Sequence, residues 1–188
     1  MIQKIEGYFM KELSEKAGRI AVLSLFLLIP DYGIRMFFLL ILTTSLLPSD
    51  VHHKRISSLS ALPFSRMDLF WVSYLFLITI STVTQFIGGG LFGMNPAAVG
   101  FHWLGSLTFS TAYFSIALLS VMAGLDHFGI PLLIFFGDLI LGGLGPRGSN
   151  PYAFISPIHQ GNGVLSLLFA VGLLGLAGYL FIKKGVSR

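Results

Sequence analysis

Long apolar runs separated by short polar stretches set the pattern of this chain of 188 residues. Between Asp68 and Asp126 there is no aspartate, glutamate, lysine or arginine, so this stretch alone has room for two bilayer crossings of about 20 residues each. The pattern predicts an all-α polytopic membrane protein in which residues 17–188 form a single domain of six transmembrane helices. The six apolar runs lie at about Ala17–Pro30, Ile34–Leu47, Leu69–Ile87, Phe101–Ala123, Ile130–Leu144 and Val164–Ile182.

Basic residues decide between six spans and five. The first two runs are shorter than the roughly 20 residues that a crossing needs, so residues 20–47 are alternatively one long helix. With six spans and a cytoplasmic amino end, the outer side keeps only Arg35 and Arg147, and the other ten of the 12 lysines and arginines lie inside. With five spans, Arg35 falls within the membrane and the amino-terminal basic residues move outside, against the positive-inside bias. We therefore expect a multi-pass protein of the cell membrane with both chain ends in the cytoplasm.

Composition excludes a soluble globule. Hydrophobic residues make up 54% of the chain and charged residues only 11%, with a mean hydropathy of +0.83, which leaves too little polar surface for solvation in water. The net charge of +4 does not indicate nucleic-acid binding, because the basic residues flank apolar runs instead of forming a patch with stacking aromatics. The chain has no cysteine, so disulfides and cysteine-based metal or redox sites are excluded.

Two segments of mixed polarity flank the expected spans. Residues 1–16 combine apolar and charged side chains at roughly helical spacing, which predicts an amphipathic helix lying on lipid at the inner surface; a frayed cytoplasmic tail is the alternative. Residues 145–163, between the last two spans, mix turn-forming residues with aromatics. This composition favours a re-entrant or interfacial outer segment over a disordered loop.

The segment 49–67, between the second and third spans, has the pattern of a short cytoplasmic helix. Ser49 or Asp50 is placed to cap its first amides, and Pro63 ends it. Apolar residues at spacings of three fall on one face of this helix, and they are Ile56, Leu59 and Leu62. A helix that has one apolar stripe flanked by basic residues either rests on lipid or fits into a groove on a partner protein. The pattern alone does not distinguish between these two interpretations.

The same segment contains a run that resembles a known family. The run is Ser58-Leu59-Ser60-Ala61-Leu62-Pro63-Phe64-Ser65-Arg66-Met67-Asp68-Leu69. Placed after a second span and opening a third, it is similar to the cytoplasmic segment of ATP-binding-cassette type 2 (ABC-2-like) exporter permeases, in which leucines precede a Leu-Pro-hydrophobic-Ser/Thr-Arg/Lys turn. The resemblance extends over nearly the whole chain, as a surface helix, six spans and a polar outer segment that contains Ser156-Pro157.

The resemblance implies an ATP-driven exporter whose permease works with a separate cytoplasmic ATPase subunit. In the family, the helix before the turn docks onto that nucleotide-binding subunit, and the permease acts as a homodimer or as a heterodimer with a second permease. The residues that the resemblance implies for partner binding are Lys54, Arg55, Leu59, Leu62, Pro63, Phe64, Ser65 and Arg66.

No nucleotide-binding motif lies in the chain itself. Gly88 and Gly93 have the glycine spacing of a phosphate-binding loop, but Met94 and Asn95 follow where a lysine and a hydroxyl residue are needed. We therefore expect no cofactor in this chain, and ATP and magnesium on the partner ATPase. No Gly-x-Ser-x-Gly run supplies a serine nucleophile either, so we predict no catalytic residue and no enzyme.

Asp138 is the one acidic residue well inside an expected span. A charge at that depth costs at least about 2.5 kcal/mol, so the carboxyl group faces a polar cavity or partner, or stays protonated. A transport role and a structural hydrogen bond are both open. Hydroxyl residues of the fourth span, which also serve as helix contacts, and an outer histidine are further candidates for a transport pathway: Ser106, Thr108, Ser110, Thr111 and His159. Asp138 thus supports an alternative function as an ion- or proton-coupled secondary transporter or channel, and a third alternative is an accessory membrane subunit with no pathway of its own.

The five histidines are spread over four connections or interfaces on both sides of the expected membrane. Only His52 and His53 are neighbours in sequence, and adjacent residues do not face each other on a helix. Because no metal-ligand spacing appears, no metal site is predicted.

Overall fold

The computed structural model describes residues 2–53, 65–144 and 150–184, and its secondary structure is helical, with no strand in those ranges. The helices follow the apolar runs of the sequence. They are α1 (Ile2–Leu27), α2 (Tyr32–Ser45), α3 (Leu47–His52), α5 (Arg66–Leu91), α6 (Pro96–Met122), α7 (Gly129–Gly143), α8 (Pro151–Ile155) and α9 (Gly163–Lys184). For the described residues, the predicted all-α fold class is confirmed.

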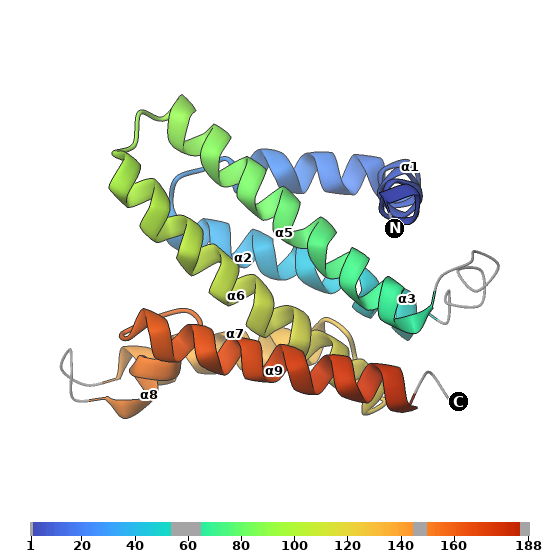
Figure 1. Cartoon of the computed structure of the whole chain (residues 1–188). Helices are drawn as coiled ribbons and strands as arrows, with labels where there is room; N and C mark the ends of the chain where they lie inside the picture. The colour runs from blue at the N-terminus through green and yellow to red at the C-terminus, as the bar shows by residue number, and fades with distance from the viewer. Residues whose placement is uncertain (1, 54–64, 145–149, 185–188) are drawn as a thin grey trace.

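Helix α6 is the centre of the bundle. It packs against α2, α3, α5, α7 and α9, and Figure 1 shows it running between α5 and α9. Its sequence contains no lysine, arginine, aspartate or glutamate, so all of its faces can be covered by other helices. Three of its aromatic side chains are fully buried and fill the core: Phe109, Tyr113 and Phe114.

Four helical stretches are long and apolar enough to cross a membrane, judged by length and composition. They are Tyr32–His52, Arg66–Leu91, Pro96–Met122 and Gly163–Lys183. The first of these is longer than the expected second span, because α3 continues α2 past a break at Leu46 and brings the stretch to 21 residues. The sequence predicted six spans. The other two correspond to the second half of α1 and to α7, which is apolar but only 15 residues long.

Large apolar side chains are exposed on the outward faces of α5, α6, α7 and α9, as contact with lipid requires. On α9, for example, Val164, Leu168 and Val171 are each more than half exposed, at 68%, 63% and 52%. Water-soluble proteins rarely expose large contiguous apolar patches. The structure is therefore compatible with a membrane protein that has four candidate spans.

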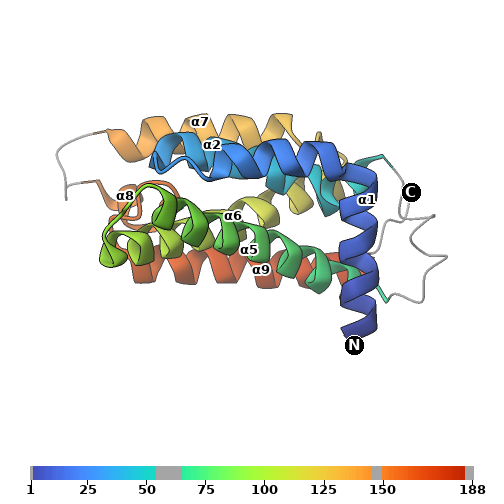
Figure 2. The same cartoon turned by 90° about the horizontal axis from the view of Figure 1, so that it is seen from above.

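Helix α1 bends at Lys16, whose backbone angles (φ −120°, ψ 15°) are not helical. Figure 2 shows the second half of α1 running along the bundle and the first half lying across one end of it. Phe9, on the first half, packs edge-to-face on Phe76 of α5, with ring centroids 4.8 Å apart. The segment expected to form an amphipathic helix is thus the first half of α1. It continues directly into the first expected span and, because of the bend at Lys16, lies across the direction of that span.

The bundle has two ends, which we name by the short helices that lie there. At the α3 end, α3 finishes, α5 and α7 begin, and α9 finishes; at the α8 end, α5 turns into α6, and α8 precedes α9 (Figures 1 and 2). The α3 end is on the right in Figure 1.

Candidate functional site

The predicted partner-binding segment is described only at its flanks. Most of its predicted residues lie outside the described ranges, namely Lys54, Arg55, Leu59, Leu62, Pro63 and Phe64. On the carboxyl side, the Ser65 hydroxyl accepts a hydrogen bond from the Asp68 amide (3.1 Å), and the Asp68 carboxylate accepts one from the Ser65 amide (3.0 Å). This reciprocal capping box fixes the first turn of α5. Arg66 is the first residue of that helix and is exposed.

On the amino side, the segment starts differently from the prediction. Ser49 and Asp50 lie inside α3 and not at a helix cap, because α3 begins at Leu47, directly after the break in α2. Pro48 lies in the first turn of α3, where the amide hydrogen that proline lacks is not needed. Both predicted capping residues are buried, and Asp50 binds a lysine of α1 instead.

A buried ion cluster joins the bend of α1 to α3. The Lys16 ammonium lies 3.0 and 3.1 Å from the two carboxylate oxygens of Asp50, and 3.0 Å from Glu12 Oε2, one helical turn earlier. Glu12, Lys16 and Asp50 are only 0%, 9% and 1% exposed. Lys11 contributes a second positive charge, 3.8 Å from Asp50 Oδ2. Lys11 also lies 3.4 Å from Glu15, which is half exposed, so the two buried acids of the cluster face two lysines. Because a buried charge without a partner is strongly destabilising, the cluster holds α1 against α3 only while both buried acids keep their lysine partners.

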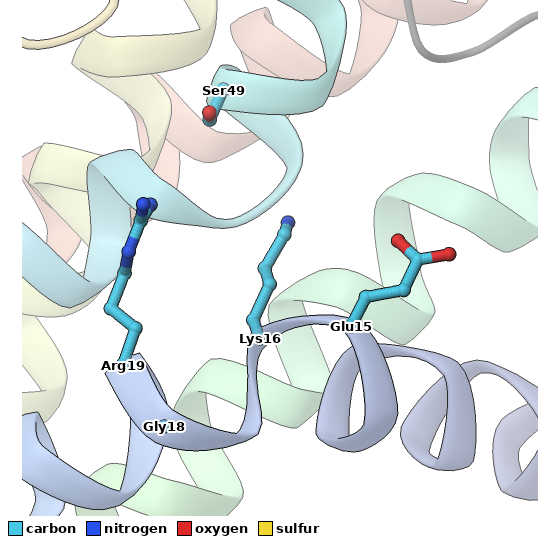
Figure 3. A pocket seen from close by; sticks show the side chains of 5 residues that line it. All are labelled: Glu15, Lys16, Gly18, Arg19 and Ser49. Carbon is cyan, nitrogen blue, oxygen red and sulfur yellow. The ribbon is translucent and has the colours of Figure 1, made fainter.

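A small polar cavity lies beside this cluster, between the bend of α1 and α3 (Figure 3). Its volume is about 190 Å³, and its lining residues are Glu15, Lys16, Gly18, Arg19 and Ser49. In Figure 3, the side chains of Lys16 and Arg19 both point from α1 toward α3. Because the Lys16 ammonium is already paired within the ion cluster, we assign the cavity to the joint between α1 and α3 and not to a substrate site.

Asp138 of α7 is 2% exposed and is held by neutral hydroxyl groups. The Ser156 hydroxyl donates to Asp138 Oδ1 at 2.6 Å, and the Tyr113 hydroxyl donates to Oδ2 at 3.3 Å. Ser156 Oγ in turn accepts hydrogen bonds from the amides of Ile158 (3.3 Å) and His159 (3.0 Å). Within the described ranges, no ion-pair partner reaches the Asp138 carboxylate. Asp138 thus ties α6 and α7 to the turn after α8 without a countercharge.

Within the described ranges, the candidate hydroxyl residues of the fourth span form their hydrogen bonds with groups other than Asp138 or, in the case of Ser110, form none. Thr108 and Thr111 donate to carbonyl oxygens one turn earlier in α6, at 3.0 and 2.7 Å. Ser106 accepts a hydrogen bond from a buried arginine, whereas Ser110 is buried without a partner among the described residues. Three of these four side chains therefore bond α6 itself or a neighbouring helix.

The buried arginine is Arg35 of α2. The sequence placed Arg35 on the outer side of the membrane, whereas its side chain is only 2% exposed and lies between helices. Its guanidinium donates to Ser106 Oγ of α6 (3.0 Å), to the Ser81 carbonyl oxygen of α5 (2.7 Å) and to the Leu27 carbonyl oxygen at the end of α1. The five N–H donors of a guanidinium allow one side chain to bind three other helices. Sequence reasoning missed these contacts because two of the acceptors are backbone carbonyls, which every residue carries.

Three histidines meet at the α3 end, although their sequence spacing did not predict it. His52 and His53 come from the end of α3, and His127 comes with Asp126 from the turn between α6 and α7. The ring centroid of His127 is 4.7 Å from that of His52 and 5.3 Å from that of His53. Only one indication in the sequence suggested that these histidines could meet. The six-span prediction puts both of the connections that carry them on the same side of the membrane.

Backbone hydrogen bonds and burial set the charges of this histidine cluster. A hydrogen bond from the Gly129 amide holds the pKa of Asp126 below its ordinary value. Burial lowers the pKa of His127, and the neighbouring Asp126 carboxylate only partly opposes this effect. At neutral pH, Asp126 is therefore ionised and the imidazole of His127 is neutral.

His159, the remaining transport-pathway candidate, lies at the α8 end. Its Nε2 atom is 3.2 Å from the Leu139 carbonyl oxygen. Its ring also packs on Gly142, where an added Cβ would lie 2.0 Å from the ring. The histidine is linked to Asp138 only indirectly, because its amide donates to the same Ser156 hydroxyl that binds the carboxylate.

Comparison with known proteins provides no family for this chain. No protein-family model, no curated protein and no solved structure matches it. The resemblance to ABC-2-like permeases therefore rests on the run 58–69 and on the order of the segments along the chain.

Proposed function

We propose that this chain is the membrane-spanning permease subunit of an ATP-driven exporter, and that it works as a dimer with a separate cytoplasmic ATPase subunit. The observation that carries the proposal is the junction at the α3 end. Residues 54–64, which contain most of the partner-binding segment, connect His53 after α3 to Ser65 before α5. A partner that displaces this segment therefore acts directly on two helices of the core.

The ion cluster supports transmission of the same displacement to α1. Asp50 belongs to α3, and its carboxylate binds Lys16 at the bend of α1. Packed helices joined by ion pairs are among the elements that carry coupling between distant sites. A movement of α3 driven by ATP hydrolysis in the partner would thus reach the helix that lies across the end of the bundle.

The proposed topology has six membrane passes, with the second half of α1 and α7 as the two short ones. Short hydrophobic helices are accommodated by local thinning of the bilayer and by flanking side chains that extend to the interface. The α3 end is the cytoplasmic one in this proposal. The positions of Arg19, Arg66 and Lys183 support that orientation, because all three lie toward the α3 end and positive charge is enriched on cytoplasmic surfaces.

A second candidate function, proton-coupled transport, is favoured by one observation. The Asp138 carboxyl group is buried without a countercharge among the described residues, and intramembrane carboxyl groups of this kind carry protons in pumps and transporters. The exporter proposal ranks first because the contacts of Asp138 also have a sufficient structural explanation, which is the attachment of the turn after α8 to α7.

The exporter proposal is tested by replacing the apolar anchors of the segment. We expect the double variant Leu59→Asp/Leu62→Asp to lose its ATPase partner, because truncating a buried anchor of an interface costs about 2 kcal/mol, or roughly thirtyfold in Kd. The tagged protein is purified from membranes of its own host, bound proteins are identified by mass spectrometry, and ATP hydrolysis by the complex is measured.

The matched control is Leu125→Asp, which places the same charge on a side chain that is 47% exposed at the same end of the bundle. The control should retain both the ATPase and its activity. Recovery of the ATPase with the double variant at the wild-type yield and activity would show that the segment is not the docking site. Absence of any ATPase from the wild-type preparation would overturn the exporter proposal itself.

A further inference from the structure

Three imidazole rings and one carboxylate converge at the α3 end, and neither the fold nor the proposed transport function requires them there. His52 and His53 close α3, while Asp126 and His127 form the turn between α6 and α7. The ring centroids of His52 and His53 are 5.1 Å apart, and those of His52 and His127 are 4.7 Å apart. Two separate connections of the chain therefore contribute nitrogen and oxygen donors to one place.

The donor atoms have nearly the spacing of a metal site. Asp126 Oδ1 lies 3.4 Å from His127 Nδ1 and 3.9 Å from His52 Nε2. One ligand atom from each of these three residues lies within 4.8 Å of the other two. Donors bound to a common ion at about 2.0–2.2 Å are themselves roughly 3–3.5 Å apart, so small side-chain rotations bring this set onto one ion.

The Asp126 carboxylate is oriented by the backbone. Its Oδ2 atom accepts hydrogen bonds from the amides of Phe128 (3.0 Å) and Gly129, which leaves Oδ1 directed at the histidines. Hydrogen bonds of this kind on the second oxygen are the usual means by which proteins orient a metal-binding carboxylate. The carboxylate is thus held in a ligand position before any ion binds.

The hydrogen-bond partners of two histidines are compatible with metal binding. His127 Nδ1 is buried and lies 3.4 Å from Asp126 Oδ1. His53 Nδ1 lies 2.8 Å from the Ser49 carbonyl oxygen and must carry the proton, because a carbonyl only accepts; in the neutral ring its Nε2 is then unprotonated. A backbone acceptor on the far nitrogen is the arrangement typical of metal-binding histidines.

We propose that His52, Asp126 and His127 bind a divalent transition-metal ion, with His53 as the nearest additional ligand, and that zinc(II) is the ion that this donor set favours. Two or three imidazoles with one carboxylate suit zinc, whereas calcium and magnesium prefer sites made of oxygen alone. Solvent reaches the site, since His52 and Asp126 are 38% and 52% exposed. The bound ion links the end of α3 to the turn between α6 and α7, directly before the segment 54–64. This inference does not depend on the exporter proposal.

The test is equilibrium dialysis of the purified full-length protein against zinc(II), with a peptide tag that contains no histidine. We expect one zinc ion per chain. His52→Ala/His127→Ala should abolish this binding, and Asp126→Asn should weaken it at least about tenfold, because second-shell changes alone reach that size and Asp126 is a direct ligand. The asparagine oxygen still accepts the amide hydrogen bonds at the start of α7, so Asp126→Asn should fold normally by circular dichroism.

His102→Ala is the matched control, because it removes a histidine at the other end of the molecule and should leave zinc binding unchanged. Cobalt(II) provides a second measurement: the wild-type protein should show the visible absorption of cobalt bound to nitrogen and oxygen ligands, and the double variant should not. Failure of the wild-type protein to bind zinc would overturn the proposal. Equal zinc binding by the double variant and the wild-type protein would overturn it as well.

Discussion

Two buried aspartates, one at each end of the bundle, are held by opposite means. Asp50 at the α3 end and Asp138 at the α8 end are 1% and 2% exposed. Asp50 accepts both of its short contacts from the ammonium group of Lys16, within the buried ion cluster. Asp138 accepts from the hydroxyl groups of Ser156 and Tyr113 and has no ion-pair partner among the described residues.

The difference matters because the two kinds of contact respond differently to a change of charge. A buried ion pair becomes strongly unfavourable when one partner is neutralised, since the other charge stays buried. A hydroxyl group both donates and accepts, so a carboxyl group held by hydroxyls keeps its hydrogen bonds whether or not it is protonated. The ion cluster at the α3 end therefore holds its helices together only while Asp50 is charged. The Asp138 carboxyl group at the α8 end can change its charge without losing its hydrogen bonds.

The sharpest test of this contrast is the same substitution at both sites, and Asp50→Asn should have the larger effect. Neutralising Asp50 leaves two lysines with one buried acid, so we expect a loss of about 3 kcal/mol in the free energy of unfolding. Unfolding by increasing amounts of dodecyl sulfate in detergent micelles, followed by circular dichroism, measures this change.

Glu15→Gln is the control for that experiment. Glu15 also faces Lys11, at 3.4 Å, but its side chain is 51% exposed, so neutralising it should leave the unfolding midpoint unchanged. If Asp50→Asn were as stable as this control, the ion cluster would not be the joint that we describe.

Asp138→Asn should have the smaller effect on stability, about 1 kcal/mol, because the asparagine side chain still bonds both hydroxyl groups. The same variant distinguishes the two candidate functions. Once the substrate is known, unchanged transport at every pH would leave Asp138 a structural residue, whereas loss of coupling to a proton gradient would favour the secondary transporter. A stability loss as large as that of Asp50→Asn would remove the contrast between the two ends.

The sequence predicted the helices well but not the contacts that hold charged groups inside the bundle. Apolar runs mark where helices form, because membrane-spanning helices satisfy their own backbone hydrogen bonds. The break at Leu46 was the exception: Pro48, Ser49 and Asp50 read as the start of a new helix, yet α3 continues α2 and lengthens the apolar stretch to 21 residues. Polar residues next to an apolar run mark its end only when they face water.

The partners of the buried charges are far apart in sequence and carry no local signal. Lys16 and Asp50 are 34 residues apart, and the Asp138–Ser156 hydrogen bond depends on how the chain returns after α8. Asp138 itself was identifiable as a lone acid in an apolar run. Its partners were not, because Tyr113 and Ser156 resemble many other hydroxyl residues of the chain.

The orientation of the bundle is the claim on which the docking proposal depends, and cysteine labelling tests it directly. The chain has no cysteine of its own, so single variants give an unambiguous signal. Leu125→Cys reports on the α3 end and Ala97→Cys on the α8 end, and both positions are exposed. We predict that a membrane-impermeant maleimide labels Ala97→Cys in intact cells and labels Leu125→Cys only after the membrane is opened. Labelling of Leu125→Cys from outside would contradict the account, since the partner-binding segment would then face away from any cytoplasmic ATPase.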